Sequence, residues 1–543
     1  MARGHSLQNV PIPRFPRARF NLSHSVTTSM DVGTLYPIDW QEVVPGDVFK
    51  CRAFDVSRVT SSFLKPVMDN LYLDVYHFFV PHRLVYDNFE KVFGNPNPSA
   101  YTDNALEEIP MGYGNVYAGS VGDYLGLPVG AIPQDNPVSV LPFRSFALIY
   151  DKFFRNENTT DEIYIQKKGF SLSERFGNNA FAPNSYCGKL PKVNKYKDYF
   201  TSCVPNPQKG APVTFSLGER ADVRTANEQL LTSGLNPLMM KTIPNGVAYS
   251  DTALLSIDSS LGGVRPVASP VVTQNGPSYL APVNLYADLS SANAISVDDL
   301  RLAFAYQKML ERDAVYGSRY NEYLYGHFGV HVPDAYIQFP QYLGGGRTPL
   351  NIVQVAQTSQ GTEESPLGNV GAYSWTNGRT GYSRKFKEHG LVMTVACLRY
   401  RHTYQQGIAK KWRRKVREDF YDPLFSTIGQ QPVYTSELFF SAAPDTVFGY
   451  REAWSELRSI PNTISGEMRS AATNSLDIWH FADNYSSAPT LSQSFTEETP
   501  AYVDRTLSVP SSSQDNFILN FYFDMSAVRK MPVYSMPSLI DHH

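Results

Sequence analysis

The stretch from Pro66 to Gly94 limits the possible folds of this chain more than any other part of the sequence. Its centre, residues 71–80, reads LYLDVYHFFV, with apolar or aromatic side chains at both odd and even positions. Side chains alternate between the two faces of a strand, so this segment predicts a strand that is apolar on both faces. Such a strand must be covered on both sides, as a central strand or at a contact between subunits. Pro81 ends it, because proline has no N–H to donate to a sheet.

Two further segments, Gly390–Tyr400 and Asn516–Asp524, are also nearly continuous apolar runs. All three strands lie far apart in the sequence, so they can share one core only through long-range pairing. Greek-key and jelly-roll sheets pair in this way, whereas βαβ units and repeats do not. The sequence contains no internal repeat of fixed period. We therefore predict one elaborated, mainly β domain rather than a series of small ones.

The composition agrees with a β-rich protein that has long loops. Of 543 residues, 13% are aromatic and 18% are charged, and the chain contains 38 prolines and 36 glycines. The net charge is −3, so any contact with nucleic acid has to come from local patches. The four cysteines form no CxxC pair, which indicates free thiols made in a reducing compartment. With no signal-peptide pattern and no run of about eighteen apolar residues, we expect a soluble chain that is not exported by such a signal.

The sequence divides into four parts. Residues 1–30 are expected to form an extended basic arm, since arginines alternate with prolines there; the alternative is a solvated tail. Residues 31–204 and 293–543 are expected to form the two parts of the β core. Residues 205–292 are rich in small polar residues and keep no helical period, which is typical of a surface insertion.

Two helices are expected within the loops. One begins at Pro142, since proline is favoured in the first turn of a helix, and repeats aromatic and apolar residues at helical spacing up to Phe154. The other begins at Ser296, where Ser296 and Asp299 form a capping box. We expect the second helix to be buried through its apolar residues, which are Leu300, Phe304, Tyr306, Met309 and Leu310.

The sequence contains no P-loop, no GxGxxG after a strand, no GxSxG and no HExxH, and so no recognisable catalytic or cofactor motif. His327 and His331 have the spacing of zinc ligands on a helix. Gly326, Gly329 and Pro333 argue against a helix there, and no cysteine or carboxylate completes the set. We therefore predict that the protein is not an enzyme and has no cofactor and no metal site. A glycoside hydrolase stays open as an alternative, supported only by scattered acidic residues.

The strongest local charge is the segment 410–417, which reads KKWRRKVR. Cations around an aromatic residue are typical of a surface that binds single-stranded nucleic acid through charge and base stacking. The alternatives are a solvated segment paired with Glu418 and Asp419, or an ion pair between subunits. The candidate DNA-binding residues, including arginines of the arm, are Arg14, Arg17, Arg19, Arg401, Lys410, Lys411, Trp412, Arg413, Arg414, Lys415 and Arg417.

Five stretches bracket nearly the whole chain apart from the insertion. In chain order they are 31–47, ending VVPGD, 66–84, 142–158, 333–345 and 448–470. The last is the most specific and reads FGYREAWSELRSIPNTISGEMRS. Together they resemble the major capsid protein of the microviruses, small icosahedral phages with single-stranded DNA, and most closely the gokushovirus-like branch.

The resemblance implies a viral jelly roll, which is an eight-stranded antiparallel β-sandwich with long loop insertions and a few short helices. It implies self-assembly into a T=1 icosahedral shell around circular single-stranded DNA, with the insertion forming a protrusion used in host attachment. The implied partners are other copies of the chain, the DNA genome, an internal scaffolding protein, a small basic DNA-binding protein, a DNA pilot protein and a bacterial surface receptor. The implied location is the virion, assembled in the host bacterial cytoplasm, with no insertion into a membrane.

The main alternative function is a β-sandwich glycan-binding protein, such as a lectin or part of a tail spike. The small polar residues of the insertion favour it, whereas the basic segment 410–417 and the missing export signal do not. Sedimentation distinguishes the two, because a shell is a megadalton particle and a lectin is a monomer or small oligomer.

Overall fold

The computed structural model describes residues 16–93, 107–169, 176, 181–182, 185–213, 297–317, 319–336, 338–353 and 374–534, together with the backbones of 354–356, 370–373 and six strands between 222 and 288. The chain divides into two compact units. The first comprises Met1–Lys209 and Glu311–His543, and the second is Gly210–Leu310.

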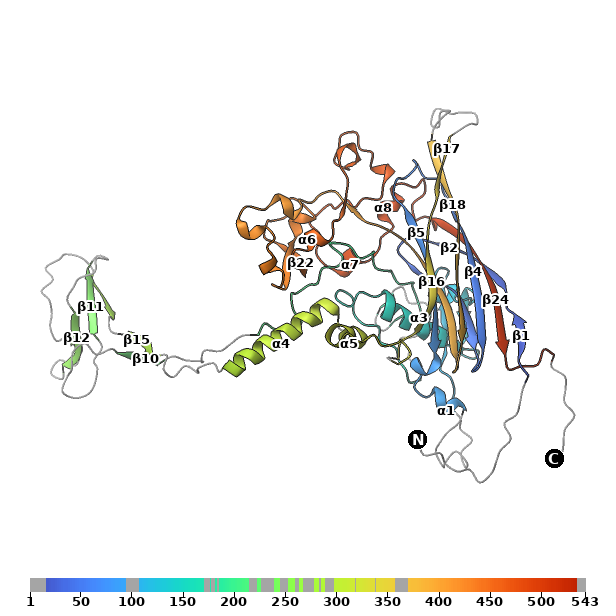
Figure 1. Ribbon diagram of the computed structural model, residues 1–543, viewed down its shortest axis with the longest axis horizontal. Helices are drawn as coiled ribbons and strands as arrows, with labels where there is room; N and C mark the ends of the chain where they lie inside the picture. The colour runs from blue at the N-terminus through green and yellow to red at the C-terminus, as the bar shows by residue number, and fades with distance from the viewer. Residues whose placement is uncertain are drawn as a thin grey trace, which may run out of the picture. The chain divides into compact units, whose positions relative to one another are not determined.

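The two largest sheets of the first unit are both antiparallel (Figure 1). The larger runs in the order β1-β24-β4-β18-β17, and β2 also pairs with β24. Its strands are β1 (Ala18–Asn21), β2 (His24–Met30), β4 (Val48–Val59), β17 (Ile352–Ala356), β18 (Val370–Lys385) and β24 (Phe517–Arg529). The smaller runs in the order β16-β5-β19-β3. Its strands are β3 (Leu35–Val43), β5 (Leu71–Pro81), β16 (Gln341–Pro349) and β19 (Gly390–Tyr400).

These strands pair as an eight-stranded jelly roll. Strands β1 and β2 pair with successive parts of β24 and together act as one edge strand. Strand β17 pairs with the start of β18 and extends it as a hairpin. The order is then β2-β24-β4-β18 in one sheet and β3-β19-β5-β16 in the other, and each connection except β5 to β16 changes sheet. The predicted fold class is confirmed.

The predicted two-sided strand is β5, which lies between β16 and β19. On one face Leu73 and Val75 are buried in the sandwich core. On the same face His77 Nε2 lies 3.0 Å from Thr380 Oγ1 of the opposite sheet, so a polar contact joins the two sheets within the core.

The other face of β5 is covered by the helix that the sequence predicts at Pro142. This helix is α3 (Leu141–Ile149), and a π-helical turn continues it over Tyr150–Phe154. The Phe78 ring lies 4.7 Å from that of Phe153, and Tyr76 lies 5.6 Å from Phe154. Strand β5 is therefore covered on both faces within one subunit.

Long connections carry the remaining elements of the first unit. Between β5 and β16 these are α1 (Phe89–Phe93), β6 (Met111–Gly112), β7 (Gly114–Val116), α2 (Val121–Tyr124), β8 (Gly130–Ile132), β9 (Val138–Ser139) and α5 (Tyr320–Phe328). Between β19 and β24 these are β20 (Thr403–Tyr404), β21 (Gln430–Tyr434), β22 (Val447–Glu452), α6 (Ser455–Arg458), β23 (Asn462–Thr463), α7 (Gln493–Thr496) and α8 (Ala501–Asp504). The second connection packs on residues 199–204 around a small core of its own, which consists of Tyr199, Phe200, Cys203, Tyr404, Val433, Leu438, Phe448 and Phe495.

The second unit contains two small sheets. Strand β10 (Asp222–Thr225) pairs with β15 (Leu285–Asp288). The other sheet runs in the order β13-β12-β11-β14. Its strands are β11 (Met239–Pro244), β12 (Thr252–Asp258), β13 (Gly263–Pro266) and β14 (Ser278–Pro282).

The N-terminal segment differs from the expected arm. Residues 18–21 and 24–30 form β1 and β2, because both segments pair with the distant strand β24. Residues 1–15, including Arg14, lie outside the described residues. The expectation of an arm is therefore limited to the residues before β1.

Two expectations about helices are wrong. Helix α4 (Val297–Tyr316) forms as predicted, but Phe304 is 65% exposed and Tyr306 is 52% exposed, so they do not bury it. Helix α5 includes His327, although Gly326 argued against a helix there. It ends at Gly329, whose φ of 68° gives a left-handed cap. None of the described helices is long and apolar enough to cross a membrane.

Candidate nucleic-acid interface

The basic segment 410–417 lies on the surface between β20 and β21. It forms two 3₁₀ turns, Lys410–Trp412 and Arg417–Asp419, rather than a continuous helix. The Trp412 side chain is 78% exposed. An aromatic ring held in water beside cations can stack on an unpaired base or enter a protein contact.

Three of the cations in this segment have partners within the chain. Lys410 Nζ donates to Gln431 Oε1 at 3.3 Å, and Arg413 donates to a backbone carbonyl. Arg414 Nη2 lies 3.3 Å from Glu456 Oε1, and both side chains are largely buried. Arg414 is therefore part of the fold of this connection. With Tyr434 and Trp454 nearby, these cations line a cavity of about 300 Å³.

Lys411, Lys415 and Arg417 are exposed, and no ion pair engages their side chains within the described part of the chain. The predicted alternative, pairing with Asp419, takes a different form. Its carboxylate accepts the backbone N–H of Val416 at 2.9 Å and of Lys415 at 2.7 Å, and these bonds hold the pKa of Asp419 below its usual range. Asp419 thus caps a turn and leaves the three side-chain charges available.

The other candidate residues lie elsewhere. Arg401 borders a cavity of about 390 Å³ that is also lined by Tyr196, Lys197, Arg347 and Asn462. Arg17 and Arg19 are exposed at the β1 edge of the larger sheet. The structure therefore does not bring all the predicted residues together. Sequence analysis did not single out Lys197 or Arg347, because neither lies in a run of consecutive cations like 410–417.

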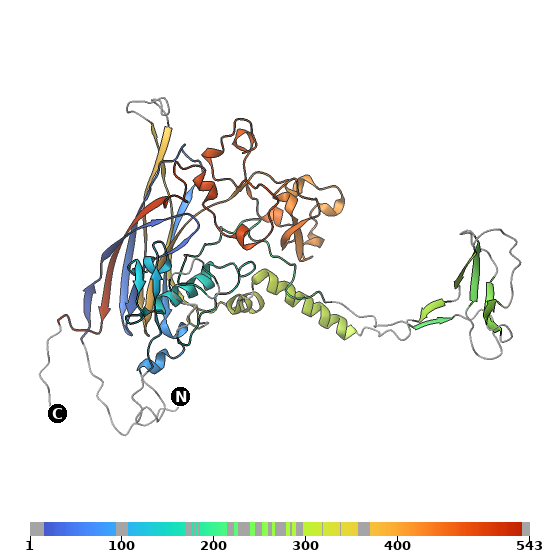
Figure 2. The same ribbon diagram turned by 180° about the vertical axis from the view of Figure 1, so that it is seen from behind.

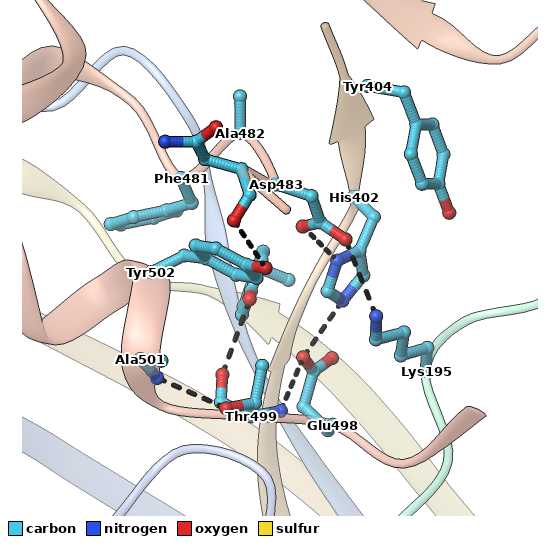
Figure 3. Close-up of polar contacts among 12 residues, drawn as sticks. Lys195, His402, Tyr404, Phe481, Ala482, Asp483, Glu498, Thr499, Ala501 and Tyr502 are labelled. Atoms are coloured by element: carbon cyan, nitrogen blue, oxygen red, sulfur yellow. Dashed lines mark hydrogen bonds and ion pairs between the residues drawn. The ribbon is translucent and has the colours of Figure 1, made fainter. Parts of the chain in front are cut away.

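His402, which follows Arg401 in the sequence, is the centre of a buried network of charged residues. Figure 3 shows His402 between Asp483 and Glu498. His402 Nδ1 lies 2.7 Å from Asp483 Oδ1, and its Nε2 lies 2.8 Å from Glu498 Oε1. Lys195 Nζ lies 3.4 Å from Asp483 Oδ2, which also accepts a hydrogen bond from Tyr485 at 2.6 Å. The network joins the end of β19 to three distant loop segments.

The charges of this network shift its pKa values. Burial lowers the pKa of His402, but the carboxylates of Asp483 and Glu498 more than offset this and raise it to about 9. Burial raises the pKa of Asp483, but His402 and Lys195 bring it down to about 2.

A histidine between two carboxylates resembles an acid–base site, but here its location argues for another role. The side chains of His402, Asp483 and Glu498 are 0% exposed, so no substrate can reach them. The arrangement is a buried ion-pair network that links separate segments of the chain. No motif in the sequence marks it, because 81 residues separate His402 from Asp483. Among the described residues, no group of three or more His, Cys, Asp or Glu is placed to hold a metal ion.

Comparison with known proteins identifies the family. Residues 8–539 match the protein family described as Capsid protein (F protein). The chain is 36% identical to Capsid protein VP1 of Spiroplasma virus 4 over 99% of this chain and 98% of that protein. It is 33% identical to Capsid protein VP1 of Chlamydia phage 1 over 99% of this chain and 100% of that protein. It is 34% identical to Capsid protein VP1 of Bdellovibrio phage phiMH2K over 98% and 97% of the two chains.

These matches confirm the resemblance noted in the sequence, and they extend it to nearly every residue of the chain. The jelly-roll pairing of the strands is the fold that the resemblance implies. Together, the sequence matches and the strand pairing place this chain in the phage capsid protein (F protein) family, among the microvirus major capsid proteins.

Proposed function

We propose that the chain forms a closed T=1 icosahedral shell around a circular single-stranded DNA phage genome. The observation that carries the proposal is a jelly-roll sandwich in a chain that matches phage capsid proteins over almost its whole length. Closed symmetry lets one kind of chain build the container, because every copy makes the same contacts. Permanent contacts of this kind bury about 2,000–5,000 Å² or more.

The size of the assembled protein tests this proposal. Sedimentation and electron micrographs of the chain, purified from cells that also make its proposed scaffolding protein, are expected to show closed megadalton particles of uniform size. A stable monomer or trimer would contradict the shell and favour the glycan-binding alternative. The relatives named above are capsid proteins, which supports the shell.

The other partners follow from the family resemblance. As a capsid protein the chain is part of the virion and assembles with copies of itself. We extend the proposal to assembly in the host bacterial cytoplasm with an internal scaffolding protein, a small basic DNA-binding protein and a DNA pilot protein. We also extend it to a bacterial surface receptor, contacted by a protrusion that residues 205–292 form.

Deleting residues 210–285 is expected to leave particle assembly intact and to abolish attachment to the host. The reason is that Gly210–Leu310 forms a compact unit of its own, so its removal leaves the strand pairs of the sandwich in place. Particle yield by sedimentation and adsorption to host cells are the measurements. Deletion of β3, Leu35–Val43, is the control and should eliminate particles, because it removes an edge strand of the smaller sheet. Loss of particles in the 210–285 deletion would show that the segment builds the shell.

Neutralising the free cations of the basic segment is expected to weaken DNA retention. In the variant Lys411→Gln, Lys415→Gln, Arg417→Gln, each lost phosphate contact should reduce the slope of log affinity against log salt by about 0.7. Salt titration of the chain with an oligothymidylate probe measures this slope. The matched control is Lys167→Gln with Lys168→Gln, two exposed cations in another loop. An unchanged slope in the triple variant would exclude this segment from DNA binding.

A further inference from the structure

In the described part of the chain, one face of the larger sheet is exposed to solvent. Along β24 and β4, buried and exposed side chains alternate, whereas nearly all side chains of β5 and β19 are buried. In Figures 1 and 2, β1, β4 and β24 form the margin of the sandwich, and α3 lies on its opposite side. We call this uncovered surface the open face. Its residues are the outward side chains of β1, β2, β4, β18 and β24.

The open face is strongly basic, although the whole chain carries a net charge of −3. Its cations are Arg19 on β1, Lys50, Arg52 and Arg58 on β4, and Arg379 and Lys385 on β18. Lys50 and Arg52 are two residues apart on their strand and so stand about 7 Å from each other. Asp524, which pairs with Arg52, is the single acidic side chain among the described outward positions of these strands.

Aromatic side chains lie between these cations. Phe54 on β4 is directly opposite Arg379 on β18 and Tyr522 on β24. The Arg379 guanidinium lies 5.5 Å from the Phe54 ring centre, and the Tyr522 ring is stacked beside Phe54 at 6.5 Å. Tyr522 is 48% exposed, and Trp375, across from Arg58, is 51% exposed.

This composition distinguishes between possible partners. A protein interface is depleted of charge at its centre, and burying six cations against a protein would require matching acids. Duplex DNA keeps its bases paired and stacked, so it offers no free base faces to the exposed aromatic rings of this sheet. Single-stranded nucleic acid offers phosphates for the cations and unpaired bases for the aromatic rings, and sheet surfaces with exposed aromatic residues bind it in this way.

We propose that the open face of the larger sheet binds single-stranded DNA and is therefore the side of the sandwich that faces the interior of the shell. The inference rests on the proposed function and adds the orientation of the subunit. Hydrogen-bonding side chains surround the aromatic residues and complete the surface. They are Ser25, Thr27, Asn377, Ser383 and Asn520.

The test compares three variants of the dissociated chain with an oligothymidylate probe across a range of salt concentrations. In Arg52→Gln, Arg58→Gln, Arg379→Gln, the salt slope is expected to fall by about 2, from three contacts of about 0.7 each. Tyr522→Ala should weaken binding about fivefold or more at every salt concentration and leave the slope unchanged, because it removes stacking and not charge. Asp524→Asn should strengthen binding, because it removes the acid from the face.

Several outcomes would overturn the inference. One is a triple variant whose slope equals that of the Lys167→Gln, Lys168→Gln control. Another is a slope that depends entirely on Lys411, Lys415 and Arg417. Electron micrographs separate this inference from the proposed function. Closed particles with normal DNA content in the triple variant would contradict DNA binding by the open face but leave the proposed shell intact. Absence of particles from the wild-type chain would contradict the shell itself.

Discussion

Replacing Asp74 by asparagine is expected to lower the free energy of unfolding of the subunit by about 3–5 kcal/mol, the range found when one partner of a buried ion pair is removed. Asp74 lies on β5 and its side chain is 0% exposed. Its Oδ1 accepts from Arg347 Nε at 2.8 Å, and its Oδ2 accepts from Arg399 Nε at 3.1 Å. The asparagine has the same shape but no charge, so both guanidinium groups would lose their counterion.

The size of this effect follows from how many elements Asp74 joins. Arg347 is on β16 and Arg399 on β19, the two neighbours of β5 in the smaller sheet. Tyr196, from the connection between β5 and β16, donates its hydroxyl to Asp74 Oδ2 at 2.8 Å. Its ring contacts both guanidinium groups, at 4.1 and 4.3 Å from the ring centre. Loss of the Asp74 charge therefore weakens three strands and a loop together.

Urea unfolding of the isolated subunit measures the effect. Asp524→Asn is the matched control, because it makes the same chemical change in an ion pair with Arg52 whose two side chains are both exposed. Exposed pairs contribute about 0–1 kcal/mol, so the control should unfold close to the wild-type midpoint. Equal midpoints for the two variants would show that Asp74 does not hold the sheet together.

The sequence predicted the central strands well, because burial on both faces leaves a signal in consecutive residues. The two-sided run at 71–80 is β5, and Gly390–Tyr400 is β19 with the predicted bounds. The third run is different. In β24, Phe521 and Phe523 face the core, while Tyr522 faces outward on the open face. In the sequence an exposed aromatic residue cannot be distinguished from a buried one. The sequence therefore predicted the strand but not that one of its faces is exposed.

The candidate DNA contacts show a second limit of sequence analysis. The segment 410–417 stands out because its cations are consecutive. The cations of the open face are separated in the sequence and become neighbours only through strand pairing, as Arg379 and Phe54 do. Helix α4 shows a third limit. Capping and periodicity predict that a helix forms, but they do not say what covers its apolar residues.

Raising the pH from about 6.5 to about 9 is expected to remove about 3 kcal/mol of stability from the subunit through His402. The pKa of His402 is about 9 in the folded chain and 6.5 without its partners. A raised pKa means that the folded state holds the proton more tightly, so the stabilisation is complete below about pH 6.5 and is lost as the pH rises through about 9. Asp483 affects stability at the acidic end of the pH range. Because its pKa of about 2 lies below the ordinary 3.8, its contribution to stability is lost only as the pH falls below about 3.8 and through about 2.

The variant His402→Gln isolates this effect from the other groups that titrate in alkali. It leaves Asp483 and Glu498 buried with Lys195 as the remaining cation, so it should be least stable relative to wild type below about pH 6.5 and approach wild type above about pH 9. Urea midpoints of the isolated chain across this range measure the difference. His331→Gln is the matched control, since His331 is exposed, and it should follow the wild-type profile. If the stability difference between His402→Gln and wild type were the same at every pH, His402 would not be protonated in the folded chain. The end of β19 would then be linked to the loops by neutral hydrogen bonds rather than by ion pairs.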